Sequence, residues 1–163
     1  MNKKISDDYI GIYGRLNNDR IIRYIQRKYV ESHDNLDYYK VFVPKSNGSG
    51  ALGEVLSTPV IGQPVIGHTQ TFISIGRFST EYEANSLLKY LKSKFSRCML
   101  GILKVTQDNK KSVWKYVPMQ DFTPNSDIDW NKSVTAIDRQ LYAKYALSDE
   151  EIDFIEDKIK PME

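Results

Sequence analysis

One amphipathic segment, beginning near residue 80, constrains the fold of this chain more than any other feature. Thr80 and Glu83 have the spacing of a capping box, in which a hydroxyl and a carboxylate satisfy free N–H groups at the start of a helix. The apolar residues that follow at the spacing of one helix face are Ala84, Leu87, Leu88, Leu91, Phe95, Met99 and Ile102. The pattern predicts one long amphipathic helix over 80–102, and we expect a mixed sheet in the same domain.

Several segments favour strands that would form this sheet. The runs at 38–43 and 71–75 are rich in β-branched and aromatic residues, which are typical of strands. A shorter β-prone run spans 9–15, and 113–117 is expected to be another strand because an apolar–aromatic run there ends at a proline.

Two further helices are expected at the end of the chain, over 134–145 and 148–159. The second begins with another capping box, formed by Ser148 and Glu151. We therefore expect an α+β fold, with a mixed sheet body, a long amphipathic helix and a C-terminal helical hairpin.

The charge is distributed unevenly along the 163 residues, although the net charge is only +2. Residues 1–50 carry nine Lys and Arg against six Asp and Glu, and residues 71–120 carry nine against three. Residues 121–163 reverse this balance, with five basic residues against eleven acidic ones. We expect an α+β domain over 1–120 that attracts a polyanion, and an acidic helical tail over 121–163 that packs on it.

The sequence lacks the motifs of phosphate-binding loops, dinucleotide-binding folds, zinc proteases and serine hydrolases. His33, His68 and the single Cys98 are too few for a metal cluster, so we expect no metal. One cysteine also fits a reducing cytoplasm, and no apolar run approaches the roughly 20 residues of a membrane span. Asp127 and Asp129 fit either a metal-dependent nuclease site or the turn before a helix, where aspartate is common.

Three segments are candidates for contact with nucleic acid. Asp19 is expected to cap a helix over 20–30, on which Arg20, Arg23 and Arg27 share one face. Arginine pairs with phosphates and guanine edges, but a basic face that is merely solvated is the alternative.

The second candidate is the loop that begins at Lys45, where small residues would let backbone N–H groups approach a phosphate. It opens a stretch over 45–67 that is dense in glycine and proline, so a flexible connection is equally compatible. The third candidate, over 104–115, combines lysines with Gln107, whose amide can read adenine. Its alternative is a polar turn with Trp114 in the core. The residues expected to contact DNA are Arg15, Arg20, Arg23, Arg27, Lys45, Ser46, Asn47, Ser49, Lys104, Gln107, Lys110, Lys111 and Lys115.

Three long blocks occur in a characteristic order: TFISIGRFSTEYEANSLLKYLKSKF, KVTQDNKKSVWKYVPMQDF and LYAKYALSDEEIDFIEDKIKPM. Together with NGSGALGEV at 47–55, they resemble the C-terminal region of bacterial Type II restriction-modification adenine-specific DNA methyltransferases, whose plan includes a TaqI-like specificity domain. The likeness covers residues 9–162. It implies that 45–50 is a loop contacting the DNA backbone and that 104–115 is part of the contact surface.

In that family a separate N-terminal domain binds S-adenosylmethionine and methylates a flipped adenine through an Asn-Pro-Pro-aromatic motif. This chain has no Asn-Pro-Pro run, so the resemblance does not extend to catalysis. It implies a target-recognition region that binds double-stranded DNA for a methyltransferase domain. We expect no cofactor in this chain, S-adenosylmethionine in the catalytic domain, and a cytoplasmic location. The alternatives are a protein-interaction module that docks through the acidic tail, and a metal-dependent nuclease.

Overall fold

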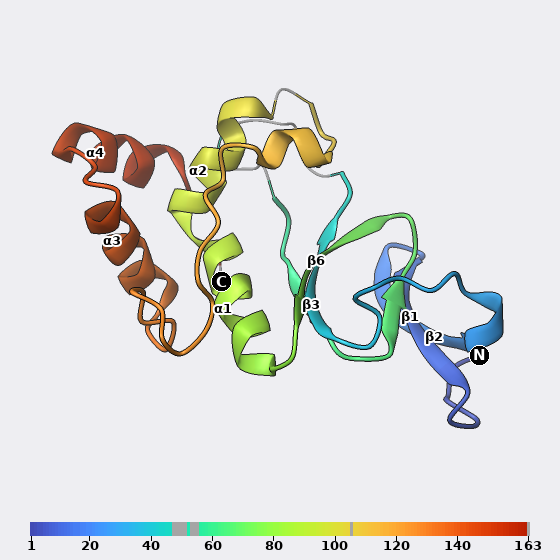
Figure 1. Ribbon diagram of the computed structural model, residues 1–163. Coiled ribbons are helices and arrows are strands. Elements are labelled where there is room, and N and C mark those ends of the chain that lie inside the picture. The colour runs from blue at the N-terminus through green and yellow to red at the C-terminus, as the bar shows by residue number, and fades with distance from the viewer. Residues whose placement is uncertain (47–51, 53–55, 105, 163) are drawn as a thin grey trace.

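The computed structural model describes residues 1–46, 52, 56–104 and 106–162. It confirms the expected α+β fold. In Figure 1 the hairpin of β1 and β2 lies at one end, β3 and β6 lie in the middle, and α3 and α4 lie at the other end. The elements are β1 (Tyr9–Leu16), β2 (Asp19–Gln26), η1 (Arg27–Tyr29), β3 (Tyr39–Pro44), β4 (Val60–Gly62), β5 (Ile66–His68), β6 (Phe72–Phe78), α1 (Glu81–Lys92), α2 (Lys94–Leu103), η2 (Lys111–Trp114), α3 (Val134–Lys144) and α4 (Asp149–Lys158).

The described strands form two three-stranded sheets. The first has the order β2-β1-β5, with β1 antiparallel to β2 and parallel to β5. The second has the order β4-β3-β6 with both pairs antiparallel, and it confirms the strands expected at 38–43 and 71–75. Tyr13 of β1 joins the sheets, because its ring stacks on Phe42 at 5.4 Å between centroids and lies 4.7 Å from Phe72.

The helix expected over 20–30 is wrong, because this segment is the strand β2 followed by the short 3-10 helix η1. Asn17 and Asn18 have positive φ angles of 51° and 68°, and Leu16 pairs directly with Asp19. Such a two-residue turn matches the twist of paired strands and directs the chain back along β1.

The long helix expected over 80–102 is divided into two. The capping box at its start is confirmed, since Thr80 Oγ1 accepts from Glu83 N and the Glu83 carboxylate accepts from Thr80 N. Ser93, however, has an extended conformation with ψ at 146°, so α1 ends there and α2 begins in a new direction. Ile102, which was expected on the buried face, is 55% exposed at the end of α2.

The strand expected over 113–117 is also wrong. Val113 N donates to Lys110 O, and Val117 N donates to Trp114 O. These local bonds use the N–H groups that a strand would offer to a neighbour, and they form the 3-10 helix η2.

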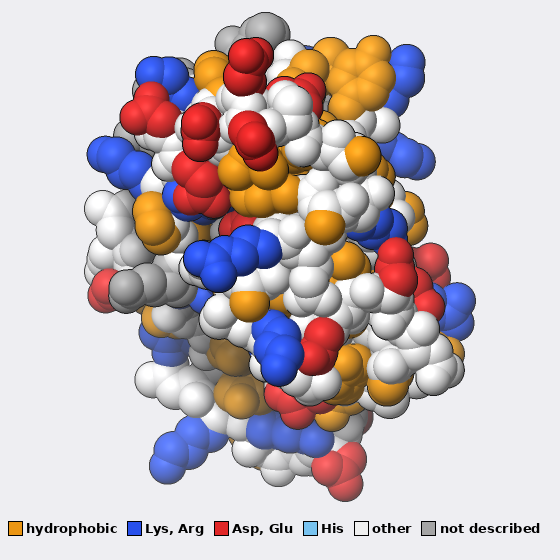
Figure 2. Space-filling model, turned by 90° about the vertical axis from the view of Figure 1, so that its left-hand side faces the viewer, with side chains coloured by type: hydrophobic (Ala, Val, Ile, Leu, Met, Phe, Trp, Pro, Cys, Tyr) orange, Lys and Arg blue, Asp and Glu red, His pale blue; other side chains and the backbone are white. Residues whose placement is uncertain are grey.

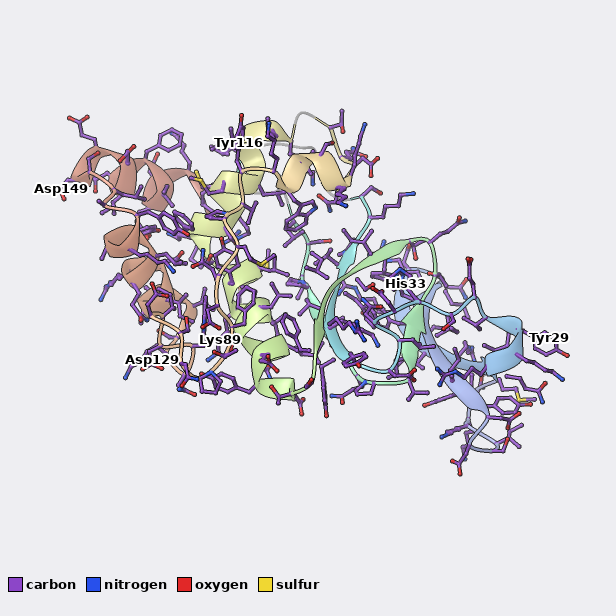
Figure 3. The ribbon with its side chains drawn as sticks, in the orientation of Figure 1. Tyr29, His33, Lys89, Tyr116, Asp129 and Asp149 are labelled. Carbon is purple, nitrogen blue, oxygen red and sulfur yellow. The ribbon has the colours of Figure 1, made fainter. Side chains whose placement is uncertain are left out.

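One hydrophobic core runs from the second sheet through α1 and α2 into the tail. The helices expected at the C-terminal end are confirmed as α3 and α4, with the capping box of Ser148 and Glu151 at the start of α4. Trp130 is 2% exposed and its indole N–H donates to Asp121 O. Lys89 of α1 donates to Trp130 O at 2.7 Å, close to Asp129 in Figure 3. The division into 1–120 and 121–163 stays a prediction.

Lys40 on β3 is buried at 1% exposure between the two sheets. Its ammonium donates to the carbonyls of Leu36, Tyr38 and Gln63 at 2.8, 3.0 and 3.1 Å. These bonds use all three donors of the group, and burial lowers the pKa of Lys40 to about 8. Lys40 therefore ties the start of β3 to the loop before β5. His33, Asn35 and His68 line the pocket beside it.

We expect Lys40→Met to lower the free energy of unfolding by about 2 kcal/mol at pH 7, because it leaves buried carbonyls without donors. The exposed Lys45→Met is the matched control and should change stability by less than about 0.5 kcal/mol. Since the folded pKa lies below the unfolded value, the wild type should gain stability relative to Lys40→Met as the pH rises from 8 to 10. Urea titrations at both pH values measure this, and a gap that narrows with pH would contradict it.

Candidate nucleic-acid interface

Two of the three candidate segments are joined at the end of β3. Ser46 forms an antiparallel bridge with Asp108, and Asn109 N donates to Lys45 O at 2.7 Å. The buried Asn109 side chain also donates through Nδ2 to Pro44 O at 2.8 Å. These bonds hold the turn before η2 against the loop that starts at Lys45, although more than 60 residues separate the two segments in sequence.

The lysines of this junction are exposed beside a cleft. Lys45, Lys110 and Lys111 line it, together with the acidic residues Glu83, Asp108 and Asp121. The cleft has a volume of about 840 Å³ and lies between β6, α1 and the segment 108–123. Its apolar and aromatic walls include Ile73, Ile75, Phe78, Leu87, Tyr90, Leu91, Trp114 and Phe122. The interior is therefore apolar, and the polar part of its lining carries both lysines and carboxylates.

The tip of the β1–β2 hairpin adds two arginines to this edge. Arg15 and Arg20 are direct partners across the antiparallel pair, so both side chains lie on the same face. Like charges in this arrangement repel each other unless an anion lies between or near them. Arg20 is held by a hydrogen bond from Nη1 to Thr58 O at 2.8 Å, whereas Arg15 is exposed.

The hairpin tip and the lysine junction are neighbours. The Arg20 guanidinium lies 5.9 Å from the centre of the Phe72 ring. Thr71, the residue before Phe72, accepts a hydrogen bond through its carbonyl oxygen from Lys45 N at 2.9 Å. In Figure 1 the hairpin turn, the end of β3 and η2 lie along the same side of the molecule. We call this surface the cationic edge; its residues are Arg15, Arg20, Lys45, Lys110 and Lys111.

The cationic edge carries no ion pair with any carboxylate of the described ranges. Other cations are neutralised locally: Lys94 pairs with Glu156, and Lys144 pairs with Asp127 at 2.8 Å. An exposed row of unneutralised cations attracts a polyanion most strongly at low salt.

Two arginines that were expected in the same group lie elsewhere. Because side chains alternate along a strand, Arg23 lies on the face of β2 opposite to Arg20. Arg27 follows the far end of β2, where its guanidinium forms two hydrogen bonds with Asp37 at 2.6 and 2.9 Å. This contact lowers the pKa of the Asp37 carboxyl. Arg27 therefore has an anionic partner within the fold.

The remaining expected residues have different settings. Lys104 is 3% exposed, and burial lowers its pKa, so it does not belong to the exposed edge. Gln107 is exposed in the turn before η2, and the Lys115 ammonium lies 5.6 Å from the Tyr116 ring. Asn47 and Ser49 lie outside the described residues. The sequence did not single out Asn109, which joins the two loops, although an Asp-Asn pair is a common signal of a turn.

The paired aspartates have structural partners. Asp127 pairs with Lys144, while the Asp129 carboxylate accepts from Asn131 N at 3.0 Å, a bond that lowers its pKa. Within the described ranges no group of three or more His, Cys, Asp and Glu could hold a metal ion. No helix in the same ranges has the length and apolar character to cross a membrane.

The tail presents a different surface. Figure 2 looks onto the helical end, where carboxylates surround an apolar patch in the upper half of the view. A shallow pocket of about 280 Å³ lies between α2 and α4, lined by Cys98, Met99, Leu147, Glu150, Glu151, Phe154 and Ile155. Phe154 is 49% exposed beside it. This acidic surface would repel DNA.

Comparison of the chain with protein-family models, with curated proteins and with solved structures finds no match.

Proposed function

We propose that this chain is a DNA target-recognition domain of a restriction-modification adenine methyltransferase and holds duplex DNA for a catalytic domain. The observation that carries the proposal is the cationic edge, where five exposed or half-exposed cations lie together without an ion pair in the described ranges. The resemblance of the three sequence blocks to the C-terminal region of such methyltransferases supports the same function. S-adenosylmethionine then belongs to the catalytic domain, and a cytoplasmic location fits this role.

The composition of the edge favours DNA over a small anion. Its residues come from the hairpin tip, the end of β3 and the start of η2, so they form a row rather than a closed pocket. Lysine and arginine hold phosphates and fix the register of a duplex, whereas an amide reads bases. Gln107 provides such an amide in the turn that carries Lys110 and Lys111. We propose that this turn faces a groove of the duplex.

We expect the chain to bind a fluorescent 25-base-pair duplex with a strong dependence on salt. If all five residues of the edge contact phosphates, the plot of log K against log salt should have a slope of about −4.5, because each contact contributes about −0.9. Fluorescence anisotropy between 50 and 300 mM NaCl measures this slope. A pool of random duplexes gives the non-specific term, and selection from the pool identifies a preferred sequence. A slope near zero would contradict DNA binding.

A second function, docking of a protein on the tail, is favoured by the pocket between α2 and α4. Phe154 is half-exposed there, and Glu150 and Glu151 stand beside it. An apolar patch with an acidic border suits a segment that carries both apolar and basic side chains. DNA binding would use the cationic edge, and protein docking would use the acidic surface beside α4. The two functions are therefore compatible.

A further inference from the structure

The outer side of β2 is a free sheet edge. In the order β2-β1-β5, β2 has a neighbour on one side only. In an antiparallel pair, alternate residues direct their N–H and C=O groups toward one neighbour and the residues between them point away. The backbone N–H and C=O of Tyr24 point away from β1, because they bond to Met1 instead. The backbone groups of Ile22 and Gln26, two residues before and two residues after Tyr24, therefore point outward as well.

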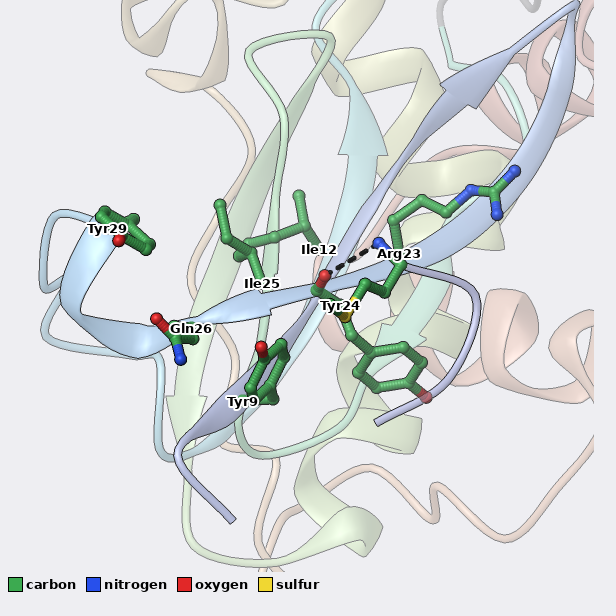
Figure 4. A pocket seen from close by; sticks show the side chains of 8 residues that line it. Tyr9, Ile12, Arg23, Tyr24, Ile25, Gln26 and Tyr29 are labelled. Carbon is green, nitrogen blue, oxygen red and sulfur yellow. Dashed lines mark hydrogen bonds between the residues drawn. The ribbon is translucent and has the colours of Figure 1, made fainter. Parts of the chain in front are cut away.

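Met1 already occupies one position of an additional strand. Tyr24 N donates to Met1 O at 2.9 Å and Met1 N donates to Tyr24 O at 3.1 Å, the second of which is drawn in Figure 4. Two bonds between the same two residues are the signature of an antiparallel pair. The next positions of such a strand lie beside Ile25 and Gln26, where no backbone of the described ranges is bonded to the outward groups of Gln26.

An open groove follows these positions. Its volume is about 560 Å³, and its lining consists of Met1, Tyr9, Ile12, Arg23, Tyr24, Ile25, Gln26 and Tyr29. Ile25 is 38% exposed and Tyr29 is 68% exposed. Figure 4 shows the tyrosines and isoleucines of the groove on both sides of β2. Strand edges in native proteins are usually protected by proline, lysine or a bulge, but β2 pairs with β1 in unbroken register.

The charges around β2 indicate the chemistry of the occupant. Within residues 19–28 the cations Arg20, Arg23 and Lys28 stand against one acidic residue, Asp19, since Arg27 is paired with Asp37. Pairing of β2 with β2 of a second copy would bring these cations together, which is unfavourable. Arg23 and Ile25 lie on one face of β2, so acidic residues of the added strand on this face would neutralise Arg23. Apolar residues at the alternate positions would lie on the other face, beside Tyr24 and Tyr9.

We propose that the free edge of β2 binds an acidic, alternately apolar strand, antiparallel to β2. The identification of its source as the catalytic partner rests on the proposed function. This mode of binding supplies affinity through backbone hydrogen bonds and specificity through alternate side chains. Arg23 then contacts protein, while Arg20 on the opposite face belongs to the cationic edge.

The experiment places the strand in the same molecule, where its effective concentration is high. Four residues, Val-Glu-Val-Glu, are added before Met1 in the full chain, so that the last glutamate lies opposite Ile25 and on the face of Arg23. The control variant carries Gly-Ser-Gly-Ser, and a charge-reversed variant carries Val-Lys-Val-Lys. We expect hydrogen exchange of the Gln26 amide to be at least about tenfold slower with Val-Glu-Val-Glu than with Gly-Ser-Gly-Ser, because the amide gains a strand partner.

The charge requirement is tested separately. The Val-Lys-Val-Lys variant should protect Gln26 less, because its last lysine lies on the face of Arg23, and Arg23→Glu should reverse this order. Equal exchange of Gln26 in the three variants would overturn the proposal, as would protection that ignores charge or a dimer of the unextended chain in sedimentation. Salt-dependent DNA binding is measured on the unextended chain, so the failure of either proposal is visible without the other.

Discussion

Alanine at four residues of the cationic edge, all except Arg20, should weaken binding to duplex DNA about 4,000-fold at 0.1 M salt. The estimate follows from the phosphate term, in which each contact contributes about 0.9 log units between 1 M and 0.1 M salt. Arg20 is retained because it also bonds to Thr58 and lies over Phe72, so its removal would disturb the hairpin. The variant should fold normally because the four side chains are exposed.

A matched variant separates position from net charge. It replaces four exposed lysines away from the edge, namely Lys3, Lys28, Lys158 and Lys160. Both variants lose four positive charges, but the matched variant should lose less than about fivefold in affinity, since screening limits charges that are farther than about 10 Å from the DNA. Anisotropy titrations at 0.1 M NaCl compare the two. Equal losses would show that net charge, rather than this edge, governs binding.

Local patterns in the sequence predicted much of the fold. The two capping boxes and the strands at 38–43 and 71–75 depend on residues within one turn or one strand, so they are legible from short segments. The α+β class followed from them. The error at 20–30 arose because Ile21, Ile22 and Ile25 satisfy helical spacing by chance. Three β-branched residues after an Asn-Asn turn favour a hairpin, and that signal was stronger.

The same error explains why the candidate site was only partly foreseen. Helical spacing places Arg20, Arg23 and Arg27 on one face, whereas a strand alternates its side chains and separates Arg20 from the other two. The junction of Lys45 with the turn before η2 depends on hydrogen bonds of Asn109 to a segment more than 60 residues away. Residue types indicated cations for DNA, but only the tertiary structure determines which of them are neighbours.

The division of the long helix has a long-range cause as well. Ser93 Oγ accepts from Ser96 N and donates to Tyr90 O, so one residue ends α1 and begins α2. The Asp138 carboxylate of α3 accepts from the first two N–H groups of α2, those of Lys94 at 3.1 Å and Phe95 at 2.9 Å. A continuous helix would direct these N–H groups to its own carbonyls. Asp138 therefore stabilises the break from 43 residues away.

Asp138→Ala should lower the free energy of unfolding by about 3 kcal/mol at pH 7, since it leaves the buried N–H of Phe95 and the half-buried N–H of Lys94 without an acceptor. Asp138 is 2% exposed, and burial raises the pKa of its carboxyl to about 6 in spite of the two donors. The exposed Asp153→Ala on α4 is the control and should change stability by less than about 0.5 kcal/mol. Urea denaturation followed by circular dichroism measures both.

The pH dependence tests the same carboxyl independently. In the unfolded chain its pKa is near 3.9, so between about pH 6 and pH 4 the folded state binds a proton that the unfolded state does not. The contribution of this carboxyl to the stability of the wild type must then rise as the pH falls through this window. Asp138→Ala lacks the group, so its deficit should be about 1 kcal/mol larger at pH 5 than at pH 7. A deficit that shrinks on acidification would contradict the raised pKa of Asp138. It would mean that the N–H groups of α2 stabilise the carboxylate as an anion, and that this charge maintains the break between α1 and α2.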